Sequence, residues 1–215
     1  MSWSRYAALG DSLTAGRDDA GPGGQRIGWA RRLAGLLTER TGMPCTLTNL
    51  ARDGVSIAEV TDQQLPLVAA IRPDLVSVTV GMNDIREPDF RPGGFAAGLA
   101  ALLDELAATR ATVLTLTLPD IAAAICLPSD LVDLARERMR QASDIIREQA
   151  ARHGAVCLDI SAMPEAADPA LFAADRIHPN GRGHQLIAAA FAGLLDEPGR
   201  FKLDNSNKRQ PPGGA

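Results

Sequence analysis

The segment Tyr6-Ala7-Ala8-Leu9-Gly10-Asp11-Ser12-Leu13-Thr14-Ala15-Gly16 joins a short apolar run to a turn in which glycines flank a serine. Residues 6–9 predict a buried β-strand, and the glycines predict a sharp turn after it. The turn is not a G-x-S-x-G nucleophile elbow, because Thr14 stands where the second glycine would be, and the chain has no G-x-x-x-x-G-K-[ST] phosphate loop. Considered alone, Ser12 is best explained as the cap of a following helical segment.

Strand-and-helix units continue along the chain. Apolar or β-branched runs predict four more strands at 45–50, 75–80, 112–118 and 156–158, and helix-period stripes predict helices at 29–40, 62–71, 95–109, 130–153 and 183–195. This alternation predicts a three-layer α/β fold, with a five-stranded parallel sheet covered by helices on both faces. Because ligands of such folds bind beyond the carboxyl ends of the strands, polar residues directly after a strand are the site candidates.

Composition narrows the functional class. The 215 residues are 46% hydrophobic and 22% charged, with a net charge of −4, which disfavours nucleic-acid and membrane-surface partners. No apolar run approaches the ~20 residues of a membrane span, and the N-terminus lacks the apolar core of a signal peptide. We therefore expect a cytoplasmic protein. Residues 1–197 fit one domain, and the polar segment 198–215, which holds both lysines, predicts a flexible tail.

Cysteine and histidine usage argues against a metal site. Cys45, Cys126 and Cys157 are odd in number and widely spaced, so we expect free thiols. The three histidines, His153, His178 and His184, show no zinc-ligand spacing. We therefore expect no zinc site.

Polar clusters follow three further strands. Residues 49–54 (Asn-Leu-Ala-Arg-Asp-Gly) follow the second strand, residues 81–84 (Gly-Met-Asn-Asp) the third, and residues 175–179 (Asp-Arg-Ile-His-Pro) the fifth. Each has a simple structural explanation: Gly54 as a turn glycine, Asn83 and Asp84 in Asx-turns, and Asp175 with His178 as a surface pair before a helix capped by Asn180. An aspartate and a histidine three residues apart, with a serine elsewhere in the fold, also fit a catalytic triad.

Taken together and in this order, the four clusters resemble the SGNH hydrolases, also called the GDSL esterase/lipase family, and most closely its compact bacterial members. The resemblance spans almost the whole domain. It implies a flavodoxin-like sheet of strand order 2-1-3-4-5 and no cofactor. It implies that Ser12 is the nucleophile, that His178 is the base and that Asp175 is the acid. It also implies oxyanion-hole donors at the backbone of Ser12, the backbone of Gly54 and the side chain of Asn83.

The expected function is hydrolysis of small acyl esters through an acyl-serine intermediate. Asn49 is expected to tie its loop to the site, and Asp84 to anchor a turn. Residues 17–28 and the apolar loop 119–128 are expected to shape substrate choice, although a buried connection explains the second loop equally well. Three alternatives remain: an acyltransferase using the same triad, a non-catalytic binding module, and a nucleotide-binding flavodoxin-like domain, which would lack its G-x-G-x-x-G turn. The sequence leaves the oligomeric state open.

Overall fold

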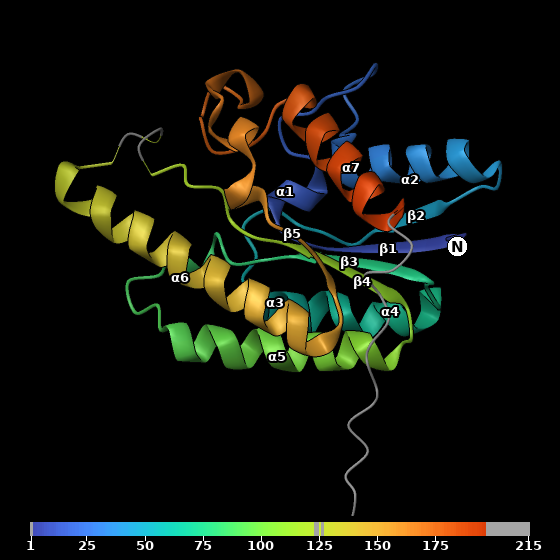
Figure 1. Ribbon diagram of the computed structural model, residues 1–215, viewed down its shortest axis with the longest axis horizontal. Coiled ribbons are helices and arrows are strands. Elements are labelled where there is room, and N and C mark those ends of the chain that lie inside the picture. Colours follow the sequence, from blue (N-terminus) through green and yellow to red (C-terminus); the bar gives the residue numbers. More distant parts are fainter. Residues whose placement is uncertain (1, 123–124, 126, 197–215) are drawn as a thin grey trace, which may run out of the picture.

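The computed structural model of the chain describes residues 2–122, 125 and 127–196 (Figure 1). Its one sheet has five strands, all parallel, in the order β2-β1-β3-β4-β5. The strands are β1 (Arg5–Gly10), β2 (Thr46–Asn49), β3 (Leu75–Thr79), β4 (Thr112–Leu116) and β5 (Val156–Leu158). This confirms the predicted α/β class and the strand order that the resemblance implied.

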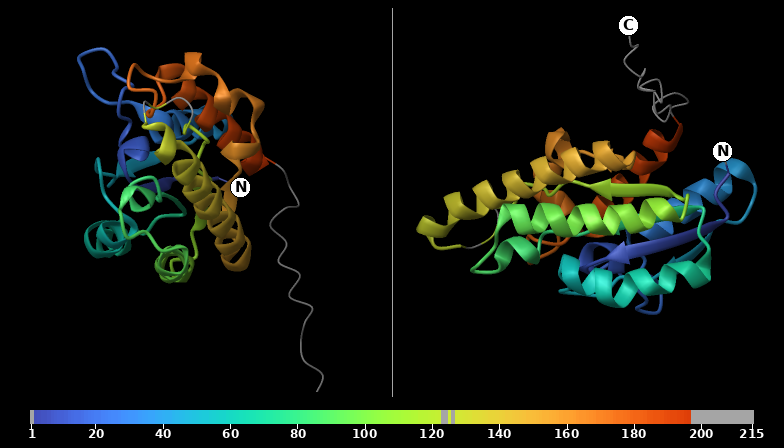
Figure 2. Two further views of the ribbon diagram at one scale, coloured as in Figure 1. Left: turned by 90° about the vertical axis from the view of Figure 1, so that its left-hand side faces the viewer. Right: turned by 90° about the horizontal axis from the view of Figure 1, so that it is seen from below.

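Helices cover both faces of the sheet (Figure 1). One face carries α1 (Ser12–Ala15), α2 (Gly28–Thr41) and α7 (Gly181–Asp196). The other carries α3 (Ile57–Glu59), α4 (Leu65–Ile71), α5 (Pro92–Ala108) and α6 (Ser129–His153), and Figure 2 shows α5 and α6 side by side. Side chains of β1 alternate between two cores, with Ala7 and Leu9 in one and Tyr6 and Ala8 in the other. Both faces of the sheet are therefore buried, as a parallel sheet requires.

The predicted elements agree with the structure to within a few residues, with one larger difference. The helix predicted at 62–71 begins earlier, with α3 at Ile57, and passes through a π-helical turn, Val60–Gln64, before α4. Ser56 and Glu59 form a capping box that fixes this earlier start. The fourth strand ends at Leu116 rather than at residue 118, because the N–H of Leu118 bonds to the Ser143 hydroxyl at 3.1 Å and leaves the ladder.

Some expectations concern residues that the structure does not describe. The predicted tail, 198–215, and Cys126 lie outside the described residues. Cys45 is buried and Cys157 half-buried, and both are free thiols in the described part of the chain. None of the helices in the described ranges combines the length and the apolar character that crossing a membrane would demand.

Gly10 at the end of β1 gives a test of the sheet. Its φ is 131°, and a Cβ there would lie 2.3 Å from the backbone oxygen of Thr79 on β3. We expect Gly10→Ala to lower the free energy of unfolding by about 3 kcal/mol. The control is Gly35→Ala inside α2, where a Cβ meets nothing within 4 Å. This substitution should raise the free energy of unfolding by about 0.5–1 kcal/mol, because alanine favours a helix more than glycine does. Urea unfolding measures both, and equal stabilities of the two variants would contradict the proposed close approach.

Candidate active site

Ser12 lies at the first residue of α1, directly beyond the carboxyl end of β1. The helix cap is Asp11, whose carboxylate accepts the N–H of Leu13 at 3.0 Å. Ser12 is therefore not the helix cap, because Asp11, one residue earlier, takes that position. The serine hydroxyl is free to bond to another group. Its Oγ lies 2.8 Å from Nε2 of His178, 166 residues further along the chain.

The loop before α7 holds His178 by means of Asp175. One carboxylate oxygen of Asp175 accepts the backbone N–H groups of Ile177 and His178, at 2.9 and 3.0 Å. The other lies 2.6 Å from Nδ1 of the His178 ring. Nδ1 therefore carries the proton and donates it to Asp175, which leaves the lone pair of Nε2 to accept the Ser12 hydroxyl.

The environment keeps Asp175 ionised. Partial burial raises the pKa of its carboxyl group. The hydrogen bonds from the His178 ring and from the backbone N–H groups of His178 and Ile177 lower this pKa by more than burial raises it, so the net shift is downward. The ring itself is well covered, with 14% of the His178 side chain exposed against 34% for Asp175. The result is a continuous hydrogen-bonded chain from Ser12 through His178 to an ionised carboxylate.

Asn83 joins the loops that follow β1 and β2. Its Nδ2 donates to the backbone oxygen of Val55 at 2.9 Å and lies 3.4 Å from a carboxylate oxygen of Asp11. Val55 follows Gly54, and Asp11 precedes Ser12, so the amide of Asn83 contacts a chain neighbour of each residue that is expected to supply a backbone donor. Gly54 has a φ of 78°, and a methyl group there would meet no atom within 4 Å. A glycine at position 54 is therefore explained by the backbone conformation and not by a lack of space for a side chain.

Further polar side chains hold these loops in place. Nδ2 of Asn49 donates to the oxygen of Thr14 at 2.8 Å, which ties β2 to α1 as expected. The carboxylate of Asp84 accepts the N–H of Ile57 at 3.0 Å, and burial raises its pKa. The sequence reasoning missed Gln64, a buried residue whose amide bonds to both the N–H and the C=O of Gly10 at 2.8 and 2.9 Å. Gln64 follows Thr61, Asp62 and Gln63 in the sequence, so no local pattern singles it out.

An apolar cavity of about 70 Å³ lies beside Ser12 and His178. Its apolar lining includes Leu116, Leu118, Pro119, Ile160, Ile177 and Ile187. A cavity of about 150 Å³ holds one benzene molecule, so this one has room for a chain of only a few carbon atoms. Of the loop 119–128, Pro119 lines the cavity, Ile121 and Ala122 are buried, and residues 123, 124 and 126 lie outside the described part of the chain.

The other two histidines have different partners and are not bonded to Ser12. His184 is fully buried in α7 and takes a structural place: the N–H of Trp29 donates to its Nδ1 at 3.2 Å, so Nε2 carries the proton and donates to the Arg17 oxygen at 3.1 Å. Burial lowers the pKa of His184, which favours this neutral form. His153 is in the last turn of α6, with its Nε2 3.2 Å from Asp104.

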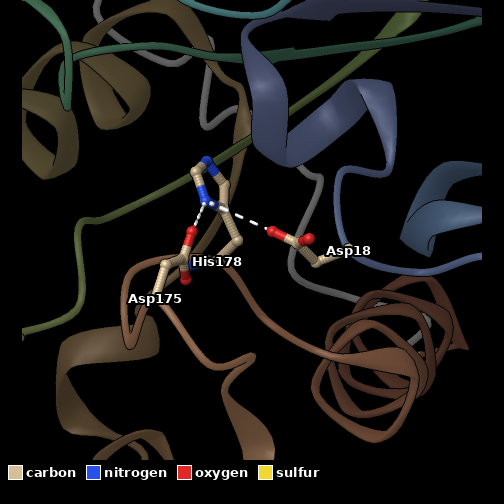
Figure 3. Close-up of side chains that lie close together, drawn as sticks. All are labelled: Asp18, Asp175 and His178. Atoms are coloured by element: carbon tan, nitrogen blue, oxygen red, sulfur yellow. Dashed lines mark hydrogen bonds and ion pairs between the residues drawn. The ribbon is translucent and has the colours of Figure 1, made fainter.

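One cluster has the composition of a metal site. Of the side chains that the structure describes, only Asp18, Asp175 and His178 bring three potential ligand atoms within 4.8 Å of one another (Figure 3). Nδ1 of His178 carries a proton and donates a hydrogen bond to Asp175, so this nitrogen has no lone pair to offer a metal ion. We assign no metal ion to the cluster.

Comparison with known proteins identifies the family of the chain. The model of the GDSL-like lipase/acylhydrolase family matches residues 8–186. The chain belongs to that family. Family membership places it among the carboxylic ester hydrolases. It is also 26% identical over 205 residues, 88% of this chain and 93% of the relative, to an acetylxylan esterase from Geobacillus stearothermophilus.

Solved structures of family members share the fold. An α/β hydrolase from the metagenome of Lake Arreo, Spain, has a TM-score of 0.71 and 26% identity, over 91% of this chain and 97% of its own. The G. stearothermophilus acetylxylan esterase has a TM-score of 0.73 and 23% identity, over 91% and 95%. Catalytic mutants of that esterase replace a histidine or a serine with alanine.

The protonation state of Asp11 can be tested through the pH dependence of stability. Burial raises the pKa of its carboxyl group to about 7, and the nearby Asp84 carboxylate adds to the rise. Because the unfolded value is about 3.9, the folded state holds the proton more tightly, and this group lowers stability as pH rises from about 4 to about 7. The free energy of unfolding of the wild type should therefore fall between pH 5 and pH 8. In Asp11→Asn, which has no carboxyl group at this position, we expect that fall to be smaller by about 2 kcal/mol.

Urea unfolding at the two pH values measures this difference. The control is Asp168→Asn, which changes an exposed aspartate that also accepts a backbone N–H, from Ala170 at 2.9 Å. The control should follow the wild type at both pH values. A wild type and an Asp11→Asn variant with parallel pH profiles would show that Asp11 is ionised in the folded protein.

Proposed function

We propose that this protein hydrolyses esters of short acyl groups through an acyl-enzyme intermediate on Ser12. The observation that carries the proposal is the hydrogen-bonded chain from Ser12 Oγ to His178 Nε2 at 2.8 Å and from His178 Nδ1 to Asp175 at 2.6 Å. A serine hydroxyl is a weak nucleophile until a base within hydrogen-bond reach takes its proton. His178 is the histidine at that distance, and Asp175 holds its ring in the tautomer that the transfer needs.

In the first half-reaction, Ser12 Oγ attacks the ester carbonyl and its proton passes to Nε2 of His178. The resulting imidazolium then gives that proton to the leaving alcohol as the ester C–O bond breaks. In the second half-reaction, a water molecule gives a proton to Nε2 and attacks the acyl carbonyl. The bond between the acyl carbon and Ser12 Oγ then breaks, and the imidazolium returns its proton to Oγ, which releases the carboxylic acid and regenerates Ser12. Asp175 stabilises the imidazolium in both halves without taking its proton.

The oxyanion is stabilised by donors that the loops around Ser12 supply. The backbone N–H groups of Ser12 and Gly54 are the first two, and the Asn83 amide is the third. Its hydrogen bond to Val55 holds that amide in place, whereas the 3.4 Å contact to Asp11 is long enough to give way to an oxyanion. The third donor thus needs little rearrangement.

The cavity beside Ser12 supports the choice of a short acyl group. Its volume of about 70 Å³ suits an acyl group of a few carbon atoms. An acetylxylan esterase among the relatives is consistent with a small acyl group carried by a larger alcohol that stays outside the cavity. No observation favours the acyltransferase alternative, which would use the same triad with an alcohol or amine in place of water.

The first prediction concerns the nucleophile. A serine-directed phosphonate should add one equivalent of mass, located at Ser12 by peptide mass spectrometry. Among the serines that the structure describes, only Ser12 has its Oγ bonded to the proposed base. His178→Gln should slow this labelling strongly, whereas His153→Gln, the matched control on α6, should label at the wild-type rate. Labelling of another serine, or ester turnover without any labelling, would refute the assignment.

The second prediction separates the oxyanion donor from the nucleophile. Asn83→Ala keeps Ser12, His178 and Asp175, so the proton transfer remains possible, but a donor to the developing oxyanion is lost. We expect kcat to fall by about 10²–10³ with little change in KM. Thermal unfolding of the variant checks that the loops of Val55 and Asp11 stay in place. A folded variant with the wild-type kcat would leave Asn83 a purely structural role.

A further inference from the structure

A second carboxylate faces the ring of His178. Asp18 belongs to the loop between α1 and α2, and its Oδ2 lies 3.6 Å from Nδ1 of His178, the same nitrogen that bonds to Asp175 (Figure 3). At 3.6 Å this contact is an ion pair with a protonated ring rather than a second hydrogen bond. The sequence reasoning connected this loop only with substrate choice and did not single out Asp18.

The backbone holds Asp18 in an uncommon conformation. Its φ is 62°, in the left-handed region that few residues other than glycine adopt. Both chain neighbours are fixed by buried or half-buried partners. The Arg17 oxygen accepts the Nε2–H of His184 at 3.1 Å, and the Asp19 carboxylate pairs with Arg32 at 2.9 Å and accepts the N–H of Gly28 at 3.0 Å. Strained residues persist where the surroundings impose them, and they concentrate at functional sites.

We propose that Asp18 is a positioning residue that supports the His178 imidazolium together with Asp175 during ester hydrolysis. The ring becomes cationic each time it takes a proton from Ser12 or from water, and a carboxylate 3.6 Å from Nδ1 stabilises that cation. The kinetic part of this inference rests on the proposed function. The electrostatic part concerns the His178 ring alone and can be tested without a substrate.

The contribution of Asp18 is limited by its surroundings. Its side chain is 40% exposed, and Nε of Arg17 lies 3.7 Å from the same carboxylate oxygen, so solvent and a cation both weaken its field. Other charged or titratable groups also lie in this region: Asp175 of the histidine's own loop, Asp11 at α1, Asp53 and Arg26 of the neighbouring loops, and His184 of α7. Arg176 follows Asp175 in the chain. These groups are unchanged by a substitution at Asp18, so a difference between variants reports on Asp18.

The test is the titration of the His178 ring by NMR in the absence of substrate, with the ring signal assigned by its loss in His178→Gln. Asp18→Asn keeps the side-chain shape, and Asp18→Gly suits the left-handed backbone, so both variants keep the turn. In both, we expect the pH midpoint of the ring to fall by about half a unit, and the difference to shrink at high salt. Asp18→Glu, which restores the charge, should recover part of the shift.

Asp104→Asn is the control, because it makes the same change in net charge on α5, which covers the opposite face of the sheet (Figure 1). It should leave the His178 midpoint unchanged. A midpoint within about 0.1 unit of the wild type in both Asp18→Asn and Asp18→Gly would overturn the proposal, since a residue that only shapes the turn does not move the ring titration.

Kinetics give the second readout. Half a unit corresponds to about threefold in the stability of the imidazolium. In Asp18→Asn we therefore expect kcat to fall about threefold and the acid limb of kcat/KM to move to lower pH, with KM unchanged. In a chain that already carries Asp175→Asn, Asp18 is the remaining carboxylate at Nδ1, and its removal should cost more than threefold. A titration shift in a protein without esterase activity would refute the proposed function and leave the role of Asp18 at the ring intact.

Discussion

The site depends on how closely β1 approaches β3 at Gly10. The backbone of Gly10 lies against Thr79, where a Cβ would be 2.3 Å from the Thr79 oxygen, and Gln64 bonds to both of its backbone polar groups. This contact sets where β1 ends and where α1 begins. Because Asp11 then caps α1, Ser12 comes at the first turn with its hydroxyl free to meet a partner from another part of the chain.

That partner comes from the far end of the sequence, and the packing of α7 brings it there. Trp29 of α2 stacks on Phe191 of α7 with ring centroids 5.0 Å apart, and the N–H of Trp29 donates to the buried ring of His184. His184 also holds the Arg17 oxygen, so one neutral imidazole fixes α7 against both α2 and the loop after α1. A histidine that takes no part in the proposed chemistry therefore aligns the two segments that carry Ser12 and His178.

The sequence predicted the fold well because its signals are local. Apolar runs and helix stripes located the five strands that the structure describes, and the polar clusters include Ser12, His178 and Asp175, which hydrogen bonds join in the structure. It failed where the deciding contact is long-range or depends on backbone conformation. The part played by Gln64 requires knowing that the π-helical turn faces Gly10, and Asp18 faces His178 only because φ is 62° and both neighbours are held by residues of α2 and α7. Neither fact is encoded in the spacing of residues.

The carboxylates of the site are sorted by environment rather than by residue type. Asp175 receives two backbone hydrogen bonds and one from the His178 ring, which together lower the pKa of its carboxyl group despite partial burial. Asp11 is buried, and its pKa rises to about 7. The proposed oxyanion needs the Asn83 amide, whose nitrogen lies 3.4 Å from Asp11. A full negative charge at Asp11 would therefore repel the oxyanion. Burial favours the neutral form of Asp11 near the proposed oxyanion, while hydrogen bonds keep Asp175 charged beside the imidazolium, so the full negative charge lies where the reaction develops a positive one.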